Sequence, residues 1–164
     1  MEFTGKNSVI TPEAVFIIGT YDENGIPNAM NAAWAMQSDM GEITIMLGKH
    51  KTTENFEKTG AFTVAYGTAN TVLISDYFGV ETGKKVNKIE KAGCHVHKSQ
   101  HVNAPIIEEY PLTLECKVLY RQDQVPCGIP DAIRERFYGH GADEGDFHTA
   151  YIGQIVSAYI IKED

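Results

Sequence analysis

Short runs of β-forming residues, separated by turn signals, make up the first third of the sequence. The run Ala14–Tyr21 (AVFIIGTY) is apolar and stops before Asn24-Gly25, a dipeptide typical of hairpin turns. The next run, Ala29–Met36, predicts one further strand, and Asp39-Met40-Gly41 predicts the turn that ends it. Glu42–Gly48 then alternates polar and apolar residues, as a half-buried strand does.

Three later segments also predict strands. Ala61–Tyr66 is rich in β-forming residues. Leu112–Tyr120 alternates, which places Leu112, Leu114, Cys116 and Val118 on one face. Ala150–Ile161 predicts a long final strand, with Gly153 as the candidate point of a break.

Short helices are predicted between these strands. Lys51–Lys58 has a helical pattern, with Thr52 or Thr53 as the candidate N-cap and Gly60 after its end. Two more short helices are predicted over Val72–Phe78 and Lys84–Lys91. A long segment, Gln122–Thr149, predicts one helix over Asp131–Tyr138 and an extended loop, and loops of this length are often functional.

Six or seven strands with short inserted helices favour a closed β-barrel, because the regular strand–helix alternation that a parallel sheet requires is missing. The fold class predicted is therefore mainly β with short helices. The 164 residues fit one domain, so we expect a single domain over residues 1–164.

The charge balance argues against nucleic acid and membranes as partners. There are 22 acidic and 14 basic residues, for a net charge of −8, and the basic residues are scattered among acidic ones. No window is long and apolar enough to span a membrane, and Met1 to Ile10 is too polar for a signal peptide. The three cysteines, Cys94, Cys116 and Cys127, form no CxxC motif, which favours free thiols and a cytoplasmic location.

Common catalytic motifs are missing from the sequence. It has no GxGxxG, GxxxxGK[ST], HExxH or GxSxG pattern. His95 and His97 would share one face of a strand, with His101 nearby, which is a geometry that metal ligands use. Because no second ligand pair accompanies them, we favour a polar surface segment and expect no metal. Cys94 and His95 would point to opposite faces, so they do not predict a nucleophile pair.

Four segments together resemble the flavin reductase-like FMN-binding split-barrel family, in particular its flavoredoxin-like branch. They agree with the family in order and spacing across about residues 10–120, and the final strand also fits. A pyridoxamine-phosphate oxidase-like protein shares the barrel but agrees less well with these motifs. The four segments are 28–36 (NAMNAAWAM), 48–64 (GKHKTTENFEKTGAFTV), 76–93 (DYFGVETGKKVNKIEKAG) and 104–115 (APIIEEYPLTLE).

This resemblance implies a Greek-key split β-barrel, a homodimer, and FMN bound non-covalently near the subunit interface. Small residues suit the close approach of a flat flavin ring, and backbone N–H groups could then reach its polar edge. The resemblance therefore makes residues 31–35 a candidate wall of the cofactor site, although a tightly packed strand would have the same composition. These residues are Asn31, Ala32, Ala33, Trp34 and Ala35.

The turn from Gly48 to Thr53 is the candidate phosphate site. It combines Gly48, His50, Lys51, Thr52 and Thr53 with a predicted helix N-terminus, which attracts anions. Helix capping by the two threonines is the structural alternative, and both roles are compatible. Many relatives carry an arginine and an aromatic residue here, where this chain has His50 and Lys51. Lys88 matches a lysine of the family pattern and is a second candidate contact, with a surface lysine as the alternative.

These features predict an NAD(P)H-dependent flavin reductase that passes electrons through FMN to free flavin, a metal ion or a partner protein. The alternatives are a flavoredoxin-type electron carrier without its own NAD(P)H turnover and a non-catalytic FMN-binding module. We expect no side-chain acid–base dyad. The 122–149 segment is a candidate cover for the flavin or a dimer arm, and its polar residues include Arg134, Arg136, His140 and His148.

Overall fold

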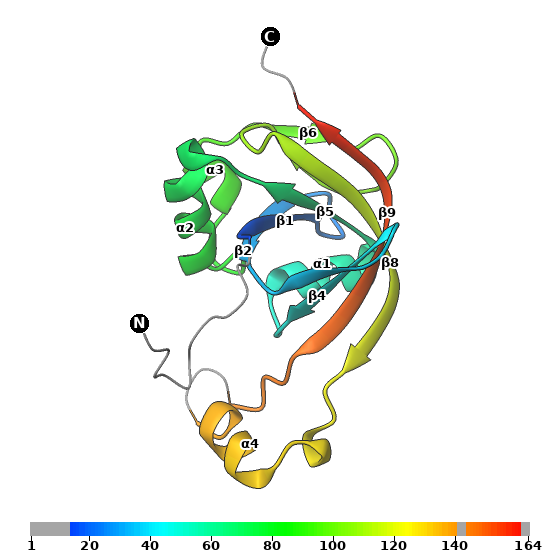
Figure 1. Ribbon diagram of the computed structural model, residues 1–164. Coiled ribbons are helices and arrows are strands. Elements are labelled where there is room, and N and C mark those ends of the chain that lie inside the picture. Colours follow the sequence, from blue (N-terminus) through cyan, green and yellow to red (C-terminus); the bar gives the residue numbers. More distant parts are fainter. Residues whose placement is uncertain (1–13, 141–143, 162–164) are drawn as a thin grey trace, which may run out of the picture.

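Seven strands form one curved antiparallel sheet in the computed structural model, which describes residues 14–140 and 144–161 (Figure 1). The strand order is β2-β1-β5-β8-β9-β4-β3. The strands are β1 (Phe16–Tyr21), β2 (Pro27–Ala32), β3 (Ala35–Asp39), β4 (Glu42–Leu47), β5 (Ala61–Tyr66), β8 (Leu112–Asp123) and β9 (Thr149–Ile160). A small second sheet pairs β6 (Val96–Lys98) with β7 (Pro105–Ile107). The mainly β split-barrel fold is therefore confirmed.

The two edges of the sheet are consecutive in the chain. β2 ends at Ala32 and β3 begins at Ala35, yet these strands lie at opposite ends of the strand order. Three peptide steps reach at most ~11 Å, so the sheet must curl until its edges nearly meet. Two predictions are wrong here: the barrel is not closed by pairing of its edges, and Ala29–Met36 is not one strand. The break allows the chain to pass from one edge to the other.

Side chains alternate between two cores on the two faces of the sheet. Phe16, Ile18 and Val64 point into the barrel, where they pack with Phe56 and Phe62. Ile17 and its neighbours point to the outer face and pack with Phe78, Ile89 and Tyr110. This alternation has the period of two that a strand imposes.

Four α-helices and two 3-10 turns connect the strands within the described residues. Helix α1 (Lys51–Thr59) contributes Phe56 to the inner core, whereas α2 (Val72–Val80) and α3 (Lys88–Ala92) lie on the outer face. The predicted helix over Lys84–Lys91 begins only at Lys88, because Asn87 accepts a hydrogen bond from the backbone of Glu90 and caps it. The short turns are Ala69–Thr71 and Pro126–Gly128.

The strands β8 and β9 extend beyond the barrel and carry α4 (Asp131–Tyr138) away from it (Figure 1). We call the segment between them, residues 124–148, the arm; residues 141–143 of it lie outside the described part. β9 continues through Gly153, so the break considered there does not occur. A Cβ on Gly153 would come within 2.5 Å of the Phe62 ring, which explains the glycine in a continuous strand.

Strand β8 is buried on both faces near its start, which the alternation did not predict. Leu114, Cys116 and Val118 face the inner core as expected, but Leu112 is exposed. On the other face Glu115 is fully buried and accepts hydrogen bonds from the backbone N–H groups of Gln100 and His101 and from the Tyr159 hydroxyl. This carboxylate joins the loop before β7 to the sheet.

Candidate functional site

A cavity of about 1010 Å³ lies where the N-terminus of α1, strand β2, the loop after α2 and the arm meet. Its volume is at the upper end of the ~300–1,000 Å³ usual for ligand sites. Nine of the eleven predicted site residues line it. They are Asn31, Ala32, Ala33, Trp34, Gly48, His50, Lys51, Thr52 and Lys88. Ala35 and Thr53 do not line the cavity.

Helix α1 directs its N-terminus at the cavity. Its N-cap is His50 rather than Thr52 or Thr53. Thr53 accepts a hydrogen bond from the His50 N–H over 2.9 Å and donates to the His50 carbonyl over 2.8 Å, so its hydroxyl is used inside the helix. Thr53 therefore has the structural role given as its alternative in the sequence analysis, which is to stabilise the start of the helix. Lys51 and Thr52, in contrast, line the cavity beside the first free N–H groups of the helix.

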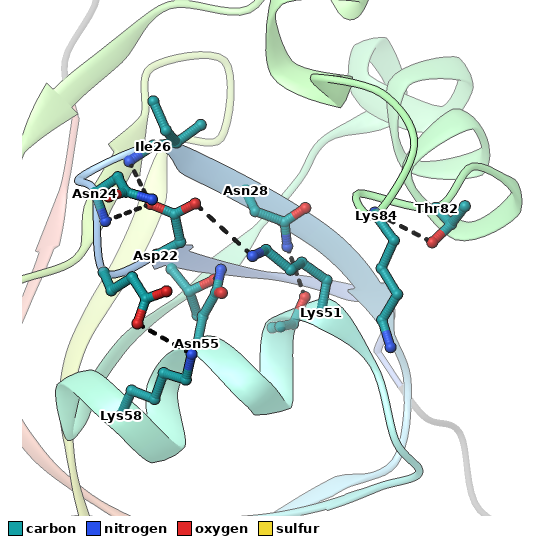
Figure 2. A network of polar contacts seen from close by, with 12 residues as sticks. Asp22, Asn24, Ile26, Asn28, Lys51, Asn55, Lys58, Thr82 and Lys84 are labelled. Carbon is teal, nitrogen blue, oxygen red and sulfur yellow. Dashed lines mark hydrogen bonds and ion pairs between the residues drawn. The ribbon is translucent and has the colours of Figure 1, made fainter.

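Asn28 joins three elements around this end of the cavity (Figure 2). Its amide donates to the Thr52 hydroxyl over 2.8 Å, which links β2 to α1. Gly83, in the loop after α2, packs so closely that a Cβ there would overlap the Asn28 oxygen. Asn28 therefore positions both the helix N-terminus and the loop, and the glycine is required by close approach.

Two of the cavity lysines are already paired with carboxylates. Lys51 forms an ion pair with Asp22 (Figure 2), with 3.7 Å between Nζ and Oδ2. Lys84 forms a 2.6 Å ion pair with Glu54. Burial lowers the pKa of His50, although the nearby Asp146 carboxylate raises it in part. The positive charges of Lys88 and Lys84 also lower the His50 pKa, so these groups share one region of the cavity.

Lys88 is a buried amine rather than the surface lysine considered from the sequence. Only 4% of it is exposed, and its Nζ donates to the Phe78 carbonyl over 2.9 Å. Burial lowers its pKa to about 8, against a smaller opposing effect of Glu81. Within residues 14–140 and 144–161, no carboxylate lies within ion-pair distance of it. The amine thus faces the cavity with donors to spare.

Another wall of the cavity consists of small and apolar residues at the junction between β2 and β3. Ala32 and Ala33 line the cavity beside Trp34, which is 57% exposed and lies edge-on to His148 with ring centroids 5.2 Å apart. The side-chain oxygen of Asn31 is buried and has no hydrogen-bond partner within the described residues. Ala35 instead belongs to β3, where it pairs with Ile45.

The arm closes one side of the cavity, and sequence reasoning did not assign its residues to the site individually. The Tyr138 hydroxyl lies 3.1 Å from His148 Nδ1, and the His148 N–H donates to Gln124. Asp146 accepts a hydrogen bond from the Lys49 N–H over 2.8 Å, and Gly48 leaves room for its carboxylate. No periodic pattern signals the contact between Lys49 and Asp146, because these residues lie 97 positions apart.

The end of α2 and the loop after it, from Phe78 to Lys84, also line the cavity. This stretch lies in segment 76–93, which carried the family resemblance, but only Lys88 of that segment was named as a site candidate. The signal available in the sequence was the pair Gly79 and Gly83. Each lies against an asparagine of β2: Gly79 against Asn31 and Gly83 against Asn28.

Two of the histidines considered as metal ligands each contact a different carboxylate. His95 pairs with Glu109 and His97 with Glu108, each over 2.9 Å. No grouping of three metal-binding side chains occurs in the described parts of the chain. Burial and the neighbouring Glu109 raise the pKa of Cys94 to about 12, so this thiol is protonated at neutral pH and is not a nucleophile.

A sequence model of the flavin reductase-like domain matches residues 9–164. The chain belongs to this family. Among solved structures, this flavin reductase-like chain is similar to the flavoredoxin of Desulfovibrio vulgaris (Miyazaki F), with 25% identity and a TM-score of 0.76, covering 98% of this chain and 75% of that one. No curated protein sequence matches it.

Two further structures share the fold of this family member. The flavoredoxin from Methanosarcina acetivorans is 24% identical with a TM-score of 0.72, covering 94% of this chain and 72% of that one. Nitrilotriacetate monooxygenase component B from Bacillus cereus is 15% identical with a TM-score of 0.74, covering 94% and 73%. Among the described helices of the flavin reductase-like chain, none has the length and apolar character to cross a membrane.

Proposed function

We propose that this chain binds FMN in the large cavity and is an NAD(P)H-dependent flavin reductase. The observation that carries the proposal is the composition of the cavity: a helix N-terminus with cationic side chains at one end, and a wall of small residues beside a buried amine. This donor set fits a ligand with one phosphate and one flat polar ring.

The phosphate would lie at the N-terminus of α1. Free N–H groups there and the adjacent Lys51, Thr52 and His50 supply hydrogen bonds and positive charge. Lys84 and Lys51 are held in place by Glu54 and Asp22, which reduces the entropy lost when they meet an anion. We retain Gly48 as a residue that permits close approach, and Thr53 acts by stabilising the turn.

The ring would lie along Ala32 and Ala33, with Lys88 at its polar edge. The Asn31 side chain has an unused acceptor beside Gly79, and a flavin edge offers N–H and carbonyl groups of matching type. When bound, FMN supplies the redox chemistry, since its ring takes up two electrons and passes them on. The ammonium of Lys88 would favour the reduced, more negative ring and so raise the reduction potential.

The arm would control access of the electron donor. Trp34, Phe137, Tyr138 and His148 line the cavity, where His148 contacts both Trp34 and Tyr138. Trp34 is 57% exposed and Phe137 is 53% exposed. A planar donor such as a nicotinamide could stack against these rings. Arg134, Arg136 and His140 lie on the same arm, where they could contact a donor or acceptor.

A homodimer is part of the proposal. Helix α4 has no buried residue, and Ile133 and Phe137 are exposed on it one turn apart. Trp34 and Met36 are also exposed at the sheet edge. Apolar surface of this kind typically marks an interface. Light scattering should give the mass of a dimer. The cytoplasmic location stays a prediction, supported by the three free cysteines.

A flavoredoxin-type electron carrier is the second candidate function. It is favoured by the similarity to the Desulfovibrio vulgaris flavoredoxin over nearly the whole chain. A non-catalytic FMN-binding module is the third alternative from the sequence.

The visible spectrum of the purified protein, followed by anaerobic addition of NADH or NADPH, separates the three. Flavin peaks that bleach within seconds support the reductase. Peaks that bleach only with dithionite, and recover with an electron acceptor, support the carrier. Reduced flavin that no tested acceptor reoxidises under anaerobic conditions supports the binding module. A colourless protein that takes up neither FMN nor FAD contradicts the whole proposal.

A further inference from the structure

Lys88 has the environment of a nucleophilic amine. It is 4% exposed, it lines the 1010 Å³ cavity, and its Nζ donates a hydrogen bond to the Phe78 carbonyl. The Phe78 ring lies beneath its Nζ at 6.0 Å from the centroid. An ammonium held by one carbonyl and one ring face, without a paired carboxylate among the described residues, loses much of its solvation and so is easily deprotonated.

The neighbouring charges offset this effect only in part. Glu81 raises the pKa of Lys88, but by less than burial lowers it, which leaves the pKa at about 8. Because burial lowers this pKa from 10.5 to about 8, a much larger share of the amine is neutral near pH 7.5 than of an ordinary lysine.

The other lysines of the cavity lack this combination. Lys84 and Lys51 are paired with carboxylates, and Lys49 is exposed. The anion-binding N-terminus of α1 and these paired lysines line the same cavity as Lys88. A ligand that places a phosphate at the helix would therefore hold the rest of its structure in the space that Lys88 faces.

We propose that Lys88 forms a reversible imine with phosphorylated aldehydes that enter this cavity. This activity goes beyond the proposed flavin reductase function. It uses the same cavity, including Lys88 at the proposed polar edge of the flavin ring, so the aldehyde and FMN compete for it. It requires no oxidant or reductant.

In this step the ammonium of Lys88 first loses its proton to solvent. The neutral Nζ then adds to the aldehyde carbon, and loss of one water molecule leaves a C=N bond in place of the C=O bond. The phosphate held at α1 keeps the aldehyde in the cavity and so raises its effective concentration at Nζ.

Pyridoxal 5′-phosphate is a suitable probe for the full chain, with and without bound flavin. Its imine absorbs in the visible, and borohydride reduction fixes the probe on the modified residue for identification by peptide mass spectrometry. We expect Lys88 to be labelled at least tenfold faster than any other lysine at pH 7.5. We expect pyridoxal, which lacks the phosphate, to react at least tenfold more slowly at the same position.

The matched controls are K88R, which keeps the charge but removes the nucleophile, and K58R, which changes an exposed lysine outside the cavity. Labelling should be lost in K88R and retained at Lys88 in K58R. Labelling spread evenly over exposed lysines of the wild-type protein overturns the inference, whether or not K88R folds. Equal rates for pyridoxal and its phosphate overturn the role of the α1 terminus.

Failure of this inference and failure of the proposed function give different results. If FMN binds and no probe attaches to Lys88 in the flavin-free protein, the imine is wrong and the flavin site stands. If Lys88 is labelled and FMN at saturating concentration gives no protection, the imine stands and the placement of FMN is wrong. Tenfold or greater protection by FMN supports both.

Discussion

The Asn28 amide donates to the Thr52 hydroxyl over 2.8 Å and so joins strand β2 to the N-terminus of helix α1. The same asparagine lies against Gly83, where there is no room for a side chain. Three separate chain segments are therefore held around one end of the cavity by a single residue. This arrangement makes the shape of the candidate phosphate site sensitive to small changes at a distance from the ligand.

Substitution of Gly83 by alanine should weaken FMN binding about tenfold. The added Cβ would overlap the Asn28 oxygen, and the loop or the asparagine must move, which typically costs about 1–3 kcal/mol. Fluorescence titration of FMN measures the effect. The control is G41A, because an added Cβ at Gly41 meets no atom within 4 Å. Unchanged affinity in G83A would mean that Asn28 does not position the site.

Most strands of the large sheet were predicted because each has a local cause, whereas the short strands β6 and β7 were not predicted. Ala61–Tyr66 is a strand with the bounds expected, since its apolar β-forming run ends at Gly67. The long strand over Ala29–Met36 was wrong because composition does not record a transfer from one sheet edge to the other. The break at Ala33-Trp34 is imposed by the curvature of the sheet.

The sequence predicted those parts of the candidate site that have a local signal or match the family resemblance, and it missed those that depend on contacts between distant segments. The turn from Gly48 to Thr52 could be found because a helix N-terminus is a local feature. The roles of Asp146 and His148 depend on the arm folding back onto the turn, which no local pattern encodes. Lys88 was correctly chosen by resemblance, but its burial depends on the packing of α3 against β2 and could not be predicted from its charged neighbours.

Substitution of Gly153 by alanine should destabilise the protein by about 1–3 kcal/mol, because the added Cβ would press on the Phe62 ring in the inner core. Urea unfolding followed by circular dichroism measures the change. G128A, at a position with open space, should unfold like the wild type. A G153A variant as stable as the wild type would show that the core around Phe62 can adjust.

Replacing Lys88 with methionine should change how stability depends on pH. The folded-state pKa of Lys88 is lowered from 10.5 to about 8, so the burial cost is fully present below pH 8. As pH rises from 8 to 10.5, the folded protein releases the proton first and the cost declines. Between pH 7 and 9 the wild type should therefore gain about 1 kcal/mol relative to K88M.

Urea unfolding of both proteins at pH 7 and pH 9 gives this difference, and all other titrating groups cancel between them. K58M, at an exposed lysine of α1, provides the control and should show no such change. Parallel pH profiles for wild type and K88M would show that Lys88 keeps its proton throughout this range.

Substitution of Asp146 by asparagine should tighten FMN binding by about three- to tenfold, on the order of 1 kcal/mol. The carboxylate lies at the turn where the phosphate is proposed to bind, and its charge opposes an incoming dianion. Asparagine keeps an oxygen that can accept the hydrogen bond from the Lys49 N–H, so the arm should stay in place.

Riboflavin has the same ring and no phosphate, and its affinity should change less than twofold. D76N, on the exposed side of α2, removes the same charge outside the cavity and should leave both affinities unchanged. An equal gain for riboflavin and FMN in D146N would show that Asp146 acts on the arm rather than on the phosphate.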